Sequence, residues 1–176
     1  MRSKAGTHLK YLCLASMFAA LVVVFTAFVK IPIAVPGQHG YVHLGDGIIY
    51  FAACLLPTPY AIFAGAGGAA LADVLTGGWV WVFATIPIKV VTVLCFGANG
   101  KKILTLRNYI MLIPGAIFCV FGYLFYEMFI VGTYTPLLSV PWNLGQSVVA
   151  SVLFVVLGLV ADKMKLKDRM EDYFII

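Results

Sequence analysis

The chain has few charged residues, and acids are especially scarce. Only 11% of its 176 residues are charged, and seven are aspartate or glutamate, against twelve lysines and arginines. With 62% hydrophobic residues and a mean hydropathy of +1.01, the sequence is too apolar for a water-soluble domain. The scarcity of charge therefore predicts an integral membrane protein of a single domain, residues 1–176.

Other absences narrow the function. The sequence contains no GxxxxGK[ST] pattern, which excludes ATP hydrolysis by a P-loop. Its four cysteines lie in apolar segments without a CxxC or His-Cys cluster, so neither a metal site nor a disulfide is expected. No serine or cysteine has an obvious base beside it. We therefore expect a protein that is not an enzyme and carries no cofactor.

The positive charges are gathered in three places. Ten of the twelve basic residues are Arg2, Lys4 and Lys10; Lys101, Lys102 and Arg107; and Lys163, Lys165, Lys167 and Arg169. Because basic loops stay in the cytoplasm, all three clusters are expected on that side of the membrane. They flank apolar spans and face anionic lipid of the bilayer, so they do not indicate nucleic-acid binding.

The apolar segments predict an all-α bundle of six transmembrane helices. Six crossings place both termini and the 101–107 loop in the cytoplasm, as the basic clusters require. The result is a multi-pass protein of a bacterial plasma membrane. The predicted helices cover residues 11–31, 43–56, 60–76, 82–98, 109–131 and 141–161.

Four ionisable residues lie inside the predicted helices, where burial in lipid is costly and a functional role is the usual reason. These are Asp46, Asp73, Lys89 and Glu127, each in the outer half of its helix. Lys89 is expected to pair with an acid, and the sequence leaves open which acid and whether the pair is only structural. Asp73 continues a stripe of small residues on the third helix and is therefore expected to face protein.

Further polar and aromatic candidates are expected in the same outer half of the bundle. Tyr123 shares a helix face with Glu127, and an aromatic ring beside a carboxylate suits a flat ligand with hydroxyl or amine groups. Asn143 and Gln146 open the sixth helix, and their amides offer both donors and acceptors. Two other candidates are His43 at the start of the second helix and Trp79 in the loop before the fourth helix. Trp79 and Trp81 of this loop are expected to anchor the chain at the membrane interface, and the alternative is that one of them also closes over a ligand.

The whole chain resembles the substrate-binding S component of an energy-coupling factor (ECF) vitamin transporter. The resemblance rests on six short helices and four sequence features: the small pair Ala15 and Ala19, the stretch His43-Leu44-Gly45-Asp46-Gly47, a Gly/Ala-rich third helix ending in Ala72-Asp73, and Pro141-Trp142-Asn143. It looks closest to the branch assigned to hydroxymethylpyrimidine, pyridoxine or riboflavin-type ligands.

The resemblance implies a subunit that captures a vitamin or precursor near the outer surface. It would dock through Ala15 and Ala19 on a transmembrane coupling subunit and topple to deliver its ligand, while two cytoplasmic ATPase subunits supply energy. With three acids against one lysine in the outer half, the ligand is expected to be neutral or cationic. The alternative is a stand-alone secondary transporter with Asp73 or Glu127 as proton relay, although the inverted repeat common in such folds is not evident.

Overall fold

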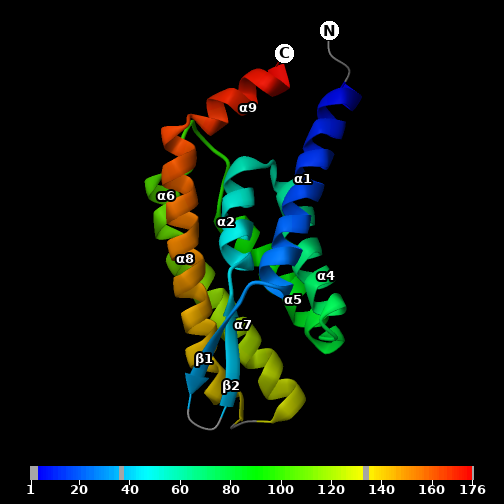
Figure 1. Ribbon diagram of the computed structural model, residues 1–176, viewed down its shortest axis with the longest axis vertical. Coiled ribbons are helices and arrows are strands. Elements are labelled where there is room, and N and C mark those ends of the chain that lie inside the picture. The colour runs from blue at the N-terminus through cyan, green and yellow to red at the C-terminus, as the bar shows by residue number, and fades with distance from the viewer. Residues whose placement is uncertain (1–3, 36–37, 133–134, 176) are drawn as a thin grey trace.

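The chain folds into a bundle of helices with one short β-hairpin, shown in the computed structural model of Figure 1. Residues 4–35, 38–132 and 135–175 are described. Each of the six apolar segments contains helix, which satisfies backbone hydrogen bonds within the segment. The helical elements are α1 (Lys4–Ala27), α2 (Gly45–Leu55), α3 (Thr58–Ile62), the π-helix η1 (Phe63–Gly67), α4 (Gly68–Leu75), the 3-10 helix η2 (Trp79–Trp81), α5 (Val82–Cys95), α6 (Leu106–Ile110), α7 (Leu112–Val131), the 3-10 helix η3 (Thr135–Ser139), α8 (Val140–Lys163) and α9 (Leu166–Ile175).

The segment after α1 is an antiparallel hairpin, which departs from the purely helical fold expected from the sequence. Strand β1 (Lys30–Val35) pairs with β2 (Gln38–His43), with Lys30 opposite His43. Pairing between the strands satisfies their backbone groups without a helix. As a result α1 ends at Ala27, earlier than predicted, and the hairpin leads into α2 at the end of the bundle opposite the termini (Figure 1).

Among the described residues, four helical stretches are long and apolar enough to cross a membrane: Ala5–Ala27, Thr58–Leu75, Leu106–Ile130 and Leu137–Lys163. Gly45–Leu55 and Trp79–Cys95 are shorter apolar helices. Nearly all of α2 is buried, and it packs against α1, α8 and η1. A helix enclosed by longer ones meets little lipid, so it does not need the roughly 20 apolar residues of an isolated span.

Both termini lie at one end of the bundle, and the loop between α5 and α6 is tied to that end (Figure 1). The Lys167 ammonium of α9 donates hydrogen bonds of 2.9, 3.1 and 3.3 Å to the carbonyl oxygens of Ala98, Gly100 and Lys102. Near the end of α8, the Asp162 carboxylate accepts bonds of 2.7 and 3.0 Å from the backbone N–H groups of Ile103 and Leu104. The three basic clusters thus belong to segments that meet opposite the hairpin.

The two terminal segments also differ from the prediction. Helix α1 begins at Lys4, well before residue 11, and the expected basic tail contains helix α9. Leu166, Met170 and Tyr173 of α9 line an apolar groove toward α1. Their spacing places them on one helix face, as in helices that lie at a membrane surface.

A close helix crossing positions the start of α2, where the candidate site begins. A Cβ at Gly47 would lie 2.9 Å from the Ala150 carbonyl oxygen of α8 and 2.9 Å from the Cβ of Leu153. Only a residue without a side chain permits this approach, so Gly47 allows α2 and α8 to bring their polar residues together.

Candidate functional site

A cavity of about 190 Å³ lies where α2, α4, α5, α7 and α8 converge, on the hairpin side of the bundle. Polar atoms make up most of its lining, which is unusual inside so apolar a protein. The lining residues are His43, Asp46, Asp73, Trp81, Thr85, Lys89, Tyr123, Glu127, Trp142, Asn143 and Gln146.

A buried ion pair forms one wall of the cavity. Lys89 Nζ of α5 lies 2.7 Å from Asp46 Oδ1 of α2, and the two side chains are only 3% and 2% exposed. Asp46 lies in the first turn of α2, where the helix dipole favours a negative charge. Lys89 Nζ also lies 5.4 Å from the Tyr123 ring centroid, within the range of a cation–π contact. The pair fixes both charges in place at the wall of the cavity.

Gln146 of α8 fixes the junction between the hairpin and α2. Its Oε1 accepts a 2.8 Å bond from the His43 backbone N–H, and its Nε2 donates 2.7 Å to the His43 carbonyl oxygen and 3.3 Å to Asp46 Oδ2. The same nitrogen lies 3.1 Å from His43 Nδ1. His43 ends β2, outside the helices, and its burial lowers the pKa of the imidazole to about 4, so the ring is neutral at neutral pH.

Aromatic rings form a second wall. Trp81 meets Tyr123 edge-on, with ring centroids 6.4 Å apart, and the Tyr123 hydroxyl lies 3.1 Å from the Thr85 hydroxyl. Trp81 also packs against Tyr126, whose hydroxyl donates to the Val80 carbonyl oxygen. These contacts hold η2 against α7. The rings can stack on a flat ligand while the hydroxyls orient its polar edge.

Two carboxylates lie apart from the ion pair. Within the described part of the chain, Asp73 Oδ2 is buried without a hydrogen-bond partner. Glu127 of α7 accepts a hydrogen bond at Oε2 from the Ser139 hydroxyl of η3. A buried carboxylate oxygen without a partner is energetically unfavourable unless a ligand or water supplies a donor. Asp73 is therefore suited to accept a bond from an N–H or O–H group in the cavity.

The structure places eight of the nine predicted ligand-contacting residues on this cavity. Trp79 lies outside it and is 63% exposed, while Trp81 takes the position at the wall. Sequence reasoning also did not select Thr85 or Trp142. A signal for Trp81 and Thr85 was present, because both precede Lys89 at four-residue steps and thus share its helix face. For Trp142, the sequence offers no such signal apart from its position next to Asn143.

The predicted groove at Ala15 and Ala19 is occupied within the chain. Ala15 is fully buried, and a Cβ at Gly68 of α4 would lie 2.8 Å from the Ala19 carbonyl oxygen. Ala19 therefore receives helix α4 of the same molecule, as small residues on a helix face commonly do. Docking of a partner subunit at Ala15 and Ala19 stays a prediction, and it would require Ala15 to become accessible.

The arrangement is that of a small binding site. It combines one fixed ion pair, two further carboxylates, the amides of Asn143 and Gln146, and three aromatic side chains. The described residues contain no group of three or more His, Cys, Asp or Glu side chains that could hold a metal ion. Such a site suits a compact, flat molecule with several hydrogen-bonding groups.

A family described as "ECF-type riboflavin transporter, S component" matches residues 7–163, which is most of the chain. No curated protein matches the sequence.

Proposed function

The chain belongs to the S-component family of ECF-type riboflavin transporters, and we propose that its 190 Å³ cavity captures a small heterocyclic vitamin or vitamin precursor for import. As a member of this family it is a multi-pass membrane protein that takes part in transport and is not an enzyme. The observation that carries the proposal is a polar cavity inside an apolar chain of this family.

The proposed orientation puts the cavity near the outer surface. The bundle would cross the membrane six times, with both termini and the basic 101–107 loop in the cytoplasm. The positive-inside rule supports this, because the basic clusters belong to the end opposite the hairpin. Members of this family work with an energising module. For this chain we propose a transmembrane coupling subunit and two cytoplasmic ATPases, since the sequence has no P-loop of its own.

Charge and size indicate the class of ligand. Lys89 neutralises Asp46, which leaves Asp73 and Glu127 to favour a neutral or cationic molecule and to disfavour an anion. A cavity of about 190 Å³ is smaller than the roughly 300–1,000 Å³ typical of sites for drug-sized ligands. A single ring, such as pyridoxine or hydroxymethylpyrimidine, therefore fits better than riboflavin, for which the cavity would have to enlarge.

The test is a binding titration of the purified chain with pyridoxine, hydroxymethylpyrimidine, riboflavin and pyridoxine phosphate, followed by tryptophan fluorescence. We expect a single-ring compound to bind most tightly and the phosphate ester to bind poorly. Glu127→Gln and Asn143→Ala should each weaken binding at least tenfold, or about 1.4 kcal/mol. Trp81→Phe should reduce the fluorescence response and leave only the part that Trp142 reports, whereas Trp79→Phe, as the matched control, should retain the full response.

Each outcome is informative. Unchanged affinity in both Glu127→Gln and Asn143→Ala would remove these residues from the site. Tightest binding of riboflavin would overturn the size argument while leaving the S-component role intact. Uptake that needs only this chain and stops on collapse of the proton gradient would instead support a secondary transporter with Asp73 or Glu127 as relay. The proposed function predicts uptake that requires partner subunits and ATP.

A further inference from the structure

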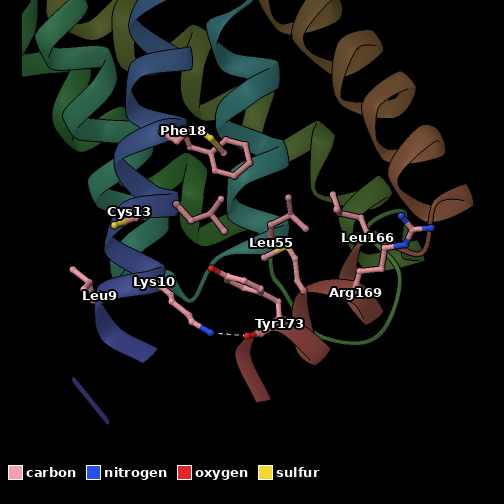
Figure 2. Close-up of a pocket in the computed structure, with 11 residues that line it drawn as sticks. Leu9, Lys10, Cys13, Phe18, Leu55, Leu166, Arg169 and Tyr173 are labelled. Atoms are coloured by element: carbon pink, nitrogen blue, oxygen red, sulfur yellow. Dashed lines mark hydrogen bonds between the residues drawn. The ribbon is translucent and has the colours of Figure 1, made fainter. Parts of the chain in front are cut away.

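A second cavity lies at the opposite end of the bundle, between α1 and α9. It has a volume of about 620 Å³ and is lined mainly by apolar side chains. Phe18 and Leu55 form its buried base, while Leu9 and Met17 of α1 and Tyr173 of α9 are more than half exposed along its walls. Figure 2 shows side chains of both helices around this space. We call it the α1–α9 groove.

We propose that the α1–α9 groove binds one anionic phospholipid of the cytoplasmic leaflet, with an acyl chain along α1 and the phosphate near Lys10 and Arg169. The proposal concerns the end of the molecule away from the ligand cavity. It does not depend on which compound that cavity binds.

The shape of the groove suits a lipid chain. Its lining on α1 runs from Leu9 to Phe18, which corresponds to roughly 14 Å along the helix axis. Since Ala5–Ala27 is a candidate span, this direction leads from the basic end of the bundle into the hydrocarbon layer. A long apolar groove parallel to a membrane helix matches an acyl chain better than a compact soluble molecule.

The charges of the groove favour an anionic headgroup. Its lining includes two cations, Lys10 from α1 and Arg169 from α9, and no acid among the described residues. Of the three acids of α9, Glu171 lines a separate cavity of about 170 Å³ together with Lys167, and Asp168 and Asp172 line neither cavity. Basic residues at the cytoplasmic surface attract anionic lipids, and the planar guanidinium of Arg can form two hydrogen bonds to a phosphate at once.

Lys10 also maintains the groove. Its Nζ donates a 2.7 Å hydrogen bond to the Tyr173 carbonyl oxygen and lies 4.1 Å from the Tyr173 ring centroid. Figure 2 shows this contact joining the two helices at one edge of the space. The contact keeps α9 against α1 and sets one cation at the mouth of the groove, where the headgroup would lie.

Native mass spectrometry of the full chain, titrated with phosphatidylglycerol or phosphatidylcholine of identical acyl chains, tests the proposal. We expect one phosphatidylglycerol per chain, bound at least about fivefold more tightly than phosphatidylcholine. Arg169→Gln leaves the Lys10 contact intact and should remove most of this preference. The double variant Lys101→Gln/Lys102→Gln, a larger charge change at the same end but outside the groove, should keep it. Met17→Trp should weaken both lipids.

A second measurement needs no substitution in the groove. Cys13 lines the groove and is exposed, so phosphatidylglycerol should slow its alkylation by a maleimide at least about fivefold more than phosphatidylcholine does. Equal protection by both lipids would overturn the proposal, as would competition by free glycerol phosphate, which would indicate a soluble anion site. If Met17→Trp blocks assembly with the energising module but leaves lipid binding unchanged, the groove is a protein interface and the proposal is wrong.

Discussion

Asp46 and Lys89 lie 2.7 Å apart in the middle of an apolar bundle, and neither charge would be stable there alone. Their mutual attraction offsets part of the desolvation of each group, and Gln146 donates a further hydrogen bond to Asp46. Both side chains also line the cavity. Because the pair is buried, a substitution that removes one of the two charges leaves the other charge buried without a partner, whereas a double substitution that removes both does not.

We predict that Lys89→Met and Asp46→Asn each lower the free energy of unfolding by about 3–5 kcal/mol, measured by denaturation in mixed micelles. The double variant should lose much less than the sum of the single losses, because no unpaired charge remains. Asp73→Asn is the matched control. It makes the same chemical change at a carboxylate with an unpartnered oxygen and should leave stability within about 1 kcal/mol of the parent. Additive losses in the double variant would contradict the coupling.

The sequence identifies the residues of the site more readily than it shows which of these side chains contact one another. An ionisable group in an apolar helix stands out by its cost alone, which is how Asp46, Asp73, Lys89 and Glu127 are identified. Which acid meets Lys89 depends on how α2 crosses α5, and no spacing along one helix encodes that crossing. The same limit applies to Gln146, whose bonds to His43 join positions 103 residues apart.

At the scale of elements, small residues decide how closely the helices approach. Gly68 lies at the crossing of α4 with α1, where a Cβ would meet the Ala19 carbonyl oxygen at 2.8 Å. Its neighbour Gly67 is exposed, and a Cβ added there would have no atom within 4 Å. Both glycines have ordinary right-handed helical backbone, so alanine suits either conformation. The two positions differ only in what surrounds them.

This contrast gives a paired prediction. Gly68→Ala should destabilise the protein by about 1–3 kcal/mol, because the added methyl group would force α1 and α4 apart. Gly67→Ala should be neutral or stabilise by up to about 1 kcal/mol through helix propensity. Thermal unfolding of the two variants, side by side with the parent, measures the difference. Equal effects would mean that the crossing is looser than the 2.8 Å approach implies.

The elements themselves are only partly accessible from the sequence. Long apolar runs bounded by prolines and charges indicate helices, and the periodic apolar face of α9 can be read from the tail. The hairpin is harder to predict, because Pro32 argues against a regular strand and favours a loop. Alternating Ile31, Ile33 and Val35 before Pro36-Gly37 is the available signal, since a Pro-Gly pair between apolar runs favours a turn.

For the whole molecule, the two ends of the bundle have opposite characters. One end holds the hairpin and the polar cavity, and the other holds the termini, the loop after α5 and the α1–α9 groove. This division is what capture at one surface and energisation at the other would require. It also means that every functional proposal depends on which end faces the cytoplasm.

Orientation can be measured with single cysteines in a chain whose four native cysteines are replaced by alanine. Asn99→Cys lies in the exposed loop held by Lys167, and Leu138→Cys lies in η3 on the cavity side; neither change alters the basic clusters. We expect an impermeant maleimide to label Leu138→Cys in intact cells and Asn99→Cys only after permeabilisation, because the basic loops remain inside. Labelling of Asn99→Cys in intact cells would place the cavity toward the cytoplasm, and a subunit so oriented could not capture its ligand from outside.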